Sequence, residues 1–139
     1  MGGASNFTYD ANGDMVTRVD EPNSASPHTV SYTWDSLGRL TQLQDPATPV
    51  DSTSQQLNFG YDHDGRRNQL TVMAWNSTIS SWNTVATEYY LWDGNQIVQK
   101  RTVNSDAGNI SAEYFTYGFQ AYSGGAWSGN YYYTKDHLK

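Results

Sequence analysis

The sequence contains no cysteine, which excludes a disulfide framework, a thiol nucleophile and a thiolate metal site. No apolar run approaches the roughly 18 residues of a membrane-spanning helix, and the first residues lack the basic and apolar regions of a signal peptide. No segment repeats its apolar residues with the helical period of about 3.6 over three turns. We therefore expect no membrane insertion and no predominantly helical fold.

Charge is also low and mostly negative. Only 16% of the residues are charged, and the formal net charge is −6. Because the few lysines and arginines are scattered, no basic patch is available to contact a phosphate backbone. Nucleic acid is therefore excluded as an expected partner.

Aromatic residues are abundant, with 11 tyrosines and 5 tryptophans. Many of them recur in one motif, in which an aromatic residue, any residue, and Tyr or Trp precede Asp and a turn with glycine. The four complete copies begin at Phe7, Tyr32, Phe59 and Tyr90, and a fifth copy, Phe115-Thr116-Tyr117, has Gly118 in place of the aspartate. Because the second aromatic residue returns after 25 to 31 residues, the chain is an array of one repeated unit.

Each unit predicts a β-hairpin, because short alternating runs flank the turn residues. The aspartate of the motif accepts backbone N–H groups in an Asx turn, and the glycine adopts a positive φ at low cost. We assign this structural turn role to Asp10, Asp35, Asp62 and Asp93. Since side chains alternate along a strand, the two aromatic residues of each copy share a face, which predicts an aromatic ladder on one face of the sheet.

The predicted fold class is all-β, with repeated antiparallel β-hairpins that form a curved sheet in a single domain over residues 1–139. The units are expected near residues 5–20, 30–44, 57–73, 88–103, 113–122 and 130–138. Surface loops at 21–27 and 45–54 carry all four prolines. A further hairpin between Trp75 and Trp82 is expected within the longest interval between copies.

These motifs resemble the RHS/YD-repeat family, whose repeat is named after its Tyr-Asp pair. The best matches are the segments 32–40 and 59–67, and the segment Tyr131-Tyr132-Tyr133-Thr134-Lys135-Asp136-His137-Leu138 resembles the start of the core segment of that family. The resemblance implies a scaffold or shell segment of a larger secreted or cell-surface bacterial protein, without the core protease or the toxin. The abrupt start of the chain within a repeat also suggests a piece of a longer protein.

A short arc of such a sheet has unpaired edge strands and an uncovered aromatic face. Burial of one Tyr or Trp side chain stabilises a fold by roughly 1.5 to 3 kcal/mol. We therefore expect the sheet to close as a barrel or sandwich, or to be completed by a homodimer that pairs through strand edges.

Neither a metal nor another cofactor is expected. Asp10, Asn12 and Asp14 have the alternating spacing of calcium ligands, but the glycine of an EF-hand loop is misplaced and no helices flank the segment. The histidines lie in different repeats, each without a second ligand at metal-binding spacing. We interpret the acidic segment as a structural turn.

Glu88 and Glu113 offer a second function. Each lies two residues before the first aromatic residue of its copy, so strand alternation predicts that both carboxylates share the face of Tyr90, Trp92 and Tyr117. Glycoside hydrolases use two carboxylates about 5 to 9 Å apart, and aromatic rings beside such a pair would fit a sugar substrate.

Two functions therefore stay open. The leading hypothesis is the structural scaffold, in which one glutamate pairs with Lys100 or Arg101 and the aromatic residues are core. The alternative is a carbohydrate-active module that binds glycosides through its aromatic face or hydrolyses them through Glu88 and Glu113. Its ligand-binding residues are Tyr90, Trp92, Tyr117 and Trp127.

Overall fold

The computed structural model describes residues 4–102, 110–115, 118–123 and 126–132 of the chain. Every regular element in these residues is a β-strand, so the all-β prediction is confirmed. No helix in this part of the chain has the length and apolar character needed to cross a membrane.

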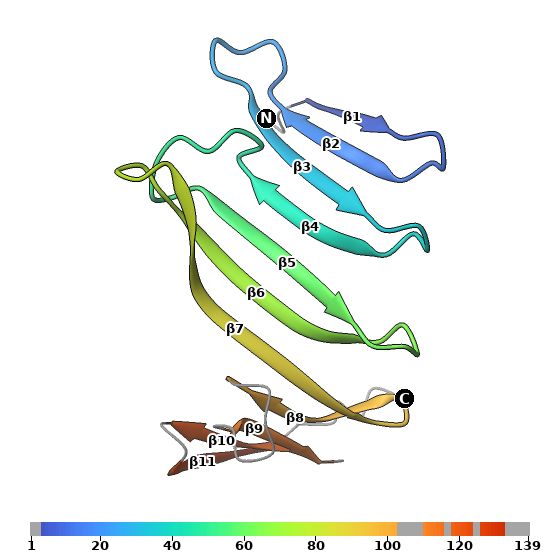
Figure 1. The fold of residues 1–139 in the computed structure, drawn as a ribbon, viewed down its shortest axis with the longest axis vertical. Helices are drawn as coiled ribbons and strands as arrows, with labels where there is room; N and C mark the ends of the chain where they lie inside the picture. Colours follow the sequence, from blue (N-terminus) through green and yellow to red (C-terminus); the bar gives the residue numbers. More distant parts are fainter. Residues whose placement is uncertain (1–3, 103–109, 116–117, 124–125, 133–139) are drawn as a thin grey trace, which may run out of the picture. The chain divides into compact units, whose positions relative to one another are not determined.

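Eleven strands follow one another along the described chain (Figure 1). Their bounds are β1 (Ser5–Tyr9), β2 (Met15–Asp20), β3 (His28–Trp34), β4 (Leu40–Asp45), β5 (Gln55–Tyr61), β6 (Arg67–Asn76), β7 (Ser81–Asp93), β8 (Gln96–Arg101), β9 (Ile110–Phe115), β10 (Gly118–Ser123) and β11 (Ala126–Tyr132). They form one antiparallel sheet in the order of the chain, with β1 and β11 at the two ends of the order. The described strands therefore form an open sheet and not a closed barrel, while a sandwich and a dimer stay predictions.

The chain divides into two compact units, which are described separately. Unit 1 is Met1–Gly60 with Leu70–Ala86, and unit 2 is Tyr61–Gln69 with Thr87–Lys139. The long strands β6 and β7 contribute residues to both units. The further hairpin expected between Trp75 and Trp82 is present: β6 and β7 are neighbouring strands joined by the turn at 77–80, and the rings of the two tryptophans lie 5.3 Å apart between centres.

In unit 1 the aromatic ladder lies on one face, as predicted. Phe7 pairs with Arg18, which in turn pairs with Val30 on β3, so the three side chains share a face. Tyr32, two residues after Val30, pairs through Leu43 with Leu57, and Phe59 follows two residues later on β5. The first aromatic residues of copies one, two and three therefore lie on the same side of the sheet.

The opposite face of unit 1 is polar. The hydroxyl oxygens of Thr8 and Thr17 are 2.6 Å apart, and Gln42 Nε2 donates to Asn58 Oδ1 at 3.2 Å. Gln56, only 8% exposed, also donates to that oxygen, at 3.0 Å. Side-chain hydrogen bonds between neighbouring strands thus stabilise this face, while apolar contacts stabilise the other.

A β-bulge precedes the turn of several hairpins. In copies one, two and four the register shifts between the last two residues of the motif's aromatic half, at Thr8/Tyr9, Thr33/Trp34 and Leu91/Trp92. In each case the extra residue lies on the return strand, at Val16, Thr41 and Val98. The strand that carries the aromatic residues has no extra residue, so its alternation places both aromatic residues of a copy on one face.

The register of unit 2 places two rows of residues on opposite faces. In one row, Tyr90 pairs with Lys100, Lys100 with Ala112, and Ala112 with Ala121. In the adjacent row, Leu91, Gln99, Glu113, Gln120 and Asn130 pair in succession from β7 to β11. Because neighbouring residues on a strand point to opposite faces, the two rows lie on different sides of the sheet.

Few side chains are fully buried. Among the described apolar residues, only Val30 and Ala112 are buried, with 2% and 5% of their surface exposed. Most strand residues are half-buried, as expected where a side chain contacts same-face neighbours within the sheet. Stability therefore depends on contacts along the sheet surface and on the turns.

Candidate functional site

The turn of each of the first three copies is organised by its aspartate. Asp35 Oδ1 accepts hydrogen bonds from the backbone N–H groups of Leu37 and Arg39, at 2.9 and 3.0 Å. Gly38, with a φ of 70°, donates its N–H to the Asp35 carbonyl at 3.0 Å. The same bonds surround Asp10 and Asp62, whose turn glycines have φ values of 90° and 80°. The aspartate thereby satisfies backbone donors that the turn leaves unpaired.

An arginine strengthens this turn in two copies. Arg39 Nε and Nη2 both lie 2.7 Å from Asp35 Oδ2, and Arg66 Nε lies 2.9 Å from Asp62 Oδ2. The backbone hydrogen bond from Arg39 and the contact with its guanidinium lower the pKa of Asp35. Burial opposes the bonds from Arg66 at Asp62, but the pKa of that carboxyl is lowered as well. Both carboxylates therefore remain ionised at neutral pH.

Tryptophan side chains connect each of two hairpins to the strand before it. The indole N–H of Trp34 donates to the carbonyl of Met15 at 2.8 Å, and that of Trp92 donates to the carbonyl of Arg67 at 3.0 Å. In both cases the donor directly precedes the aspartate of its own copy, and the acceptor is the first residue of the preceding strand. We call this hydrogen bond the tryptophan clip. It holds consecutive units in register.

The turn, the clip and the spacing of the copies describe a repeat, and comparison with known families agrees. Residues 9–50 match the family model of the RHS Repeat. These residues are an RHS repeat. Comparison with curated proteins found no match. The resemblance to RHS/YD-repeat proteins is thus confirmed by a stretch that includes the Asp10 turn, the Trp34 clip and the Asp35 turn.

Copy four departs from the turn of the RHS repeat. Asp93 is the last residue of β7 and pairs with Gln96, so only Gly94 and Asn95 form the turn. Gly94 has a φ of 55°, as a two-residue hairpin turn requires. Arg66 Nη1 donates to the Gly94 carbonyl at 2.8 Å, which joins the turn of copy three to that of copy four. This arginine therefore takes part in a second contact between repeats.

Glu88 lies in a hydrogen-bonded cluster on the Tyr90 side of unit 2. Its Oε1 accepts a hydrogen bond from Lys100 Nζ at 2.8 Å, and its Oε2 accepts one from Tyr90 Oη at 2.7 Å. Burial alone would raise the pKa of Glu88, but the bonds from Lys100 and Tyr90 outweigh it and lower the pKa. Glu88 is thus an ionised structural acceptor, as in the interpretation that pairs a glutamate with Lys100.

Tyr90 is held as a neutral phenol by the same cluster. Burial and the hydrogen bond to the Glu88 carboxylate raise the pKa of Tyr90 to about 12. The guanidinium carbon of Arg67 lies 5.4 Å from the centre of the Tyr90 ring, a distance that permits a cation–π contact. The ring therefore has a charged neighbour on its face and a charged acceptor at its hydroxyl.

Glu113 belongs to a different cluster. Its Oε1 accepts a hydrogen bond from Gln99 Nε2, and its Oε2 accepts one from Tyr122 Oη, each at 2.8 Å. The hydrogen bond to this carboxylate and burial raise the pKa of Tyr122. Glu113 therefore accepts from β8 on one side and from β10 on the other.

The two glutamates lie on opposite faces of the sheet, contrary to the expectation from the sequence. Glu88 shares the face of Tyr90, which pairs through Lys100 with Ala112, whereas Glu113 is the residue after Ala112. The expectation of a common face was wrong because it placed each glutamate by counting from the motif of its own strand, without the register between β8 and β9. The pairing of β8 with β9 places Tyr114, not Phe115, on the Tyr90 side. The two carboxylates therefore cannot flank one glycosidic bond.

The expected ligand-binding residues separate in the same way. Tyr90 and Trp92 donate hydrogen bonds within unit 2, to Glu88 and to the Arg67 carbonyl. Trp127 on β11 pairs with Tyr122 on β10 and is 60% exposed. Tyr117 lies outside the described residues. The three described residues, Tyr90, Trp92 and Trp127, are therefore not brought together as one site.

Sequence reasoning missed an aromatic row on the Tyr90 side of unit 2. Tyr114 pairs with Phe119, and Phe119 pairs with Tyr131. The Phe119 and Tyr131 rings stack with their centres 4.7 Å apart and their planes 11° from parallel. A local signal was present, because Tyr114 and Phe115 are adjacent aromatic residues and the fifth copy lacks its aspartate.

A half-open hollow of about 270 Å³ lies in unit 2 and is bordered by Asp62, Arg66, Tyr90 and Trp92, among other residues. Several of its polar groups already have partners, since Arg66 contacts both Asp62 and Asp64 and Tyr90 donates to Glu88. No group of three or more potential metal ligands occurs within the described residues. The geometry thus supports a structural role for this hollow.

Proposed function

We propose that this chain is a structural segment of an RHS-type repeat scaffold, part of a shell or wall in a larger secreted or cell-surface bacterial protein. The observation that carries the proposal is the tryptophan clip, which occurs with the same geometry at Trp34 and Trp92. A bond that ties a unit to the strand before it, as in copies two and four, helps to build a wall from nearest-neighbour contacts.

The carboxylates that catalysis would need already accept hydrogen bonds within the fold. Glu88 is bonded to Lys100 and Tyr90, and Glu113 to Gln99 and Tyr122. Since the two carboxylates lie on opposite faces, no observation favours hydrolysis by this pair. A panel of chromogenic glycosides tests this directly. Turnover that is lost in Glu88→Gln or Glu113→Gln, with folding unchanged, would contradict the scaffold proposal.

The scaffold is tested by removal of the clip. Trp34→Phe and Trp92→Phe keep an aromatic ring but remove the indole N–H donor. Each substitution should lower the free energy of unfolding by about 0.5 to 1.5 kcal/mol beyond the effect of the smaller ring. The matched control is Trp75→Phe, because Trp75 is half-buried and its indole N–H has no hydrogen-bond partner among the described residues. Equal losses in all three variants would show that the clip contributes nothing.

Self-association through the edge strands is the second part of the proposal. β1 and β11 each have a neighbour on one side only, and every residue of β1 is exposed. Pairing of β1 with β1 of a second copy forms a closed, two-fold dimer, because the same antiparallel edge meets itself. Light scattering at micromolar concentrations should therefore report a homodimer.

A variant with a charge on the edge tests the mode of pairing. Phe7 is 49% exposed at the centre of β1, so Phe7→Lys should give a monomer with an intact fold. Trp127→Lys introduces the same charge on β11 and should leave the dimer intact. A monomeric parent chain, or dissociation by Trp127→Lys alone, would contradict pairing through β1.

A further inference from the structure

The turn of copy one contains an asparagine directly before its glycine, as Asn12 and Gly13. In the corresponding turns of copies two and three, the residue before the glycine is Leu37 and Asp64. Asparagine is a heat-labile residue, because the backbone nitrogen that follows it can attack its carboxamide. A glycine in the next position presents that nitrogen without a side chain to obstruct it. The pair is therefore a candidate site of covalent change.

The turn of copy one also lacks the ion pair that strengthens the turns of copies two and three. In those copies the residue after the glycine is Arg39 or Arg66, whose guanidinium contacts the aspartate of the turn. Asp14 occupies the same position in copy one, and Asp10 has no ion pair among the described residues. Asp10 Oδ1 accepts only backbone N–H groups, from Asn12 and Asp14 at 2.9 Å. Without the charge-assisted bonds of a guanidinium, this turn should open more readily than the other two.

Both reacting groups are accessible in this turn. Residues 10–13 are exposed, and the Asn12 side chain has no hydrogen-bond partner among the described residues. A Cβ atom placed on Gly13 would meet no atom within 4 Å apart from those of the adjacent residues. The Gly13 N–H donates to the Asp10 carbonyl at 3.2 Å, which is the long end of the usual range. Loss of this one bond frees the Gly13 nitrogen.

We propose that Asn12 is a site of spontaneous deamidation. The Gly13 nitrogen attacks the side-chain carbonyl carbon of Asn12, so a bond forms between these two atoms and the Cγ–Nδ2 bond breaks. The proton of the Gly13 N–H passes through water to the leaving nitrogen, which departs as ammonia. Water then adds to one of the two carbonyl carbons of the cyclic imide and opens it. The product at this position is aspartate or isoaspartate, and the reaction needs no enzyme, metal or oxidant.

Isoaspartate would disrupt the turn, because it places an additional methylene group in the backbone. The turn is closed by the Asp10 N–H, which donates to the Asp14 carbonyl, and by the Asp14 N–H, which donates to Asp10 Oδ1, each at 2.9 Å. A longer backbone between Asp10 and Asp14 should break at least one of these bonds. The new carboxylate also lies beside two existing ones, which adds like-charge repulsion. The β1–β2 hairpin should therefore loosen at its turn.

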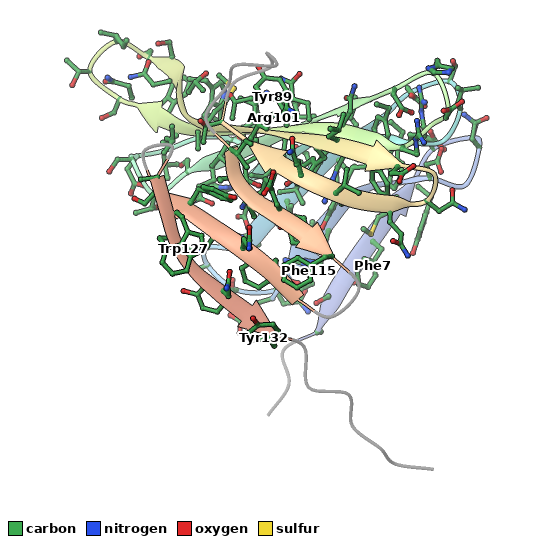
Figure 2. The ribbon with its side chains drawn as sticks, turned by 90° about the horizontal axis from the view of Figure 1, so that it is seen from below. Phe7, Tyr89, Arg101, Phe115, Trp127 and Tyr132 are labelled. Atoms are coloured by element: carbon green, nitrogen blue, oxygen red, sulfur yellow. The ribbon has the colours of Figure 1, made fainter. Side chains whose placement is uncertain are left out.

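The strand most affected by this change is β1. Every residue of β1 is exposed, and its neighbour in the sheet is β2 alone. Phe7, labelled in Figure 2, lies at the centre of β1 and is 49% exposed. Deamidation of Asn12 should thus release β1 and remove the edge through which the proposed homodimer forms. This effect on the dimer rests on the proposed function, whereas the chemistry at Asn12 does not.

The test is mass spectrometry of the full chain during storage in warm, mildly alkaline buffer. Fragmentation of the peptides locates the gain in mass that accompanies conversion of an amide to an acid, and an isoaspartate-specific methyltransferase labels the isoaspartate product. Asn12 should convert about tenfold faster than Asn95, which corresponds to about 1.4 kcal/mol in the activation barrier. Asn95 is the matched control, because it is exposed in the turn of copy four but is followed by Gln96.

Two substitutions at Asp14 test the effect of the missing ion pair. Asp14→Arg supplies the guanidinium of copies two and three and should slow the conversion of Asn12 by about threefold. Asp14→Gln removes the same carboxylate without a guanidinium and should leave the rate within about twofold of that in the parent chain. Asn12→Leu has the residue of copy two and should remain unconverted. On storage, this variant should keep its β1 amides protected from hydrogen exchange, while the parent chain loses that protection.

Conversion of Asn12 no faster than that of Asn95 would overturn the proposal. Equal rates in Asp14→Arg and Asp14→Gln would contradict the argument from the missing ion pair, and unchanged exchange of the β1 amides in the converted chain would contradict the release of β1. Light scattering of the fresh chain separates this inference from the proposed function. A fresh monomer that deamidates at Asn12 contradicts the dimer alone, whereas a dimer that stays unconverted contradicts the deamidation alone.

Discussion

Gly118 is the position at which a single methyl group should damage the sheet most. A Cβ atom at this residue would lie 2.0 Å from the Tyr131 carbonyl oxygen and 3.0 Å from two further backbone atoms of β11. Such contacts require the backbone of β10 or β11 to move by about 1 Å, since a flexible side chain is not what obstructs the methyl group. Gly118→Ala should therefore strain or separate the β10–β11 pair.

The expected cost combines overpacking with weakened pairing. Overpacking alone costs about 1 to 3 kcal/mol, and the loss of one or two ladder hydrogen bonds adds about 1 kcal/mol each. We expect Gly118→Ala to lower the free energy of unfolding by about 2 to 4 kcal/mol. Urea denaturation measures this loss, and hydrogen exchange at β11 amides shows whether the damage is local.

Gly129→Ala is the matched control within the same hairpin. There a Cβ atom would meet only the Tyr131 side chain, at 3.6 Å or more, which is an ordinary contact. The substitution also restricts the unfolded chain, so its effect should lie within about 0.5 to 1 kcal/mol of zero. Equal stability of the Gly118→Ala and Gly129→Ala variants would refute the argument from close approach.

Three further predictions concern the turns and the Glu88 cluster. Gly38→Ala should lower the free energy of unfolding, measured by heat or urea, by about 1 to 2 kcal/mol, because Gly38 has a φ of 70° although no atom would contact the added methyl group. An unchanged free energy of unfolding would contradict backbone strain as the cause. The pKa of Glu88 is lowered from 4.5, so its contribution to the free energy of unfolding is complete above pH 4.5 and is lost as the pH falls through the folded-state pKa. Glu88→Gln should remove this part of the acid-induced loss of stability, which is measured as the free energy of unfolding against pH. The pKa of Tyr90 is raised from 10.0 to about 12, so its contribution to the free energy of unfolding is complete below pH 10 and is lost as the pH rises towards 12. Tyr90→Phe should abolish this alkaline loss of stability. In a titration followed by ultraviolet absorbance, the variant should lack one phenol that ionises at high pH.

The sequence was sufficient for the hairpins and for the ladder of unit 1. Phe7, Tyr32 and Phe59 precede aspartate-centred turns of the same kind, so local alternation and turn chemistry both indicate which face they occupy. The hydrogen bonds of Asp35 follow from the same pattern, because an Asx turn is a local structure. Such features need no knowledge of distant residues.

The sequence was insufficient where the face on which a side chain lies depends on the register between strands. Tyr114 and Phe115 are both aromatic, and only the pairing of Lys100 with Ala112 shows which of them shares the Tyr90 face. A bulge between Lys100 and Arg101 accompanies this pairing, and nothing in the motif indicates it. A change of one residue in register moves a side chain to the other face, so the Glu88 and Glu113 pair was lost at this step.

The tryptophan clip has a consequence for the growth of such sequences. Its donor and acceptor are 19 residues apart at Trp34 and 25 residues apart at Trp92, yet the bond lengths differ little. The intervening chain includes the exposed loop at 21–27 in one case and the exposed tip at 77–80 in the other. Residues inserted in the loop or in the tip therefore do not displace the indole donor or the carbonyl acceptor of the clip. The loop and the tip are therefore the natural insertion points of this protein, where evolution or an engineer can graft a new peptide without altering the wall that carries it.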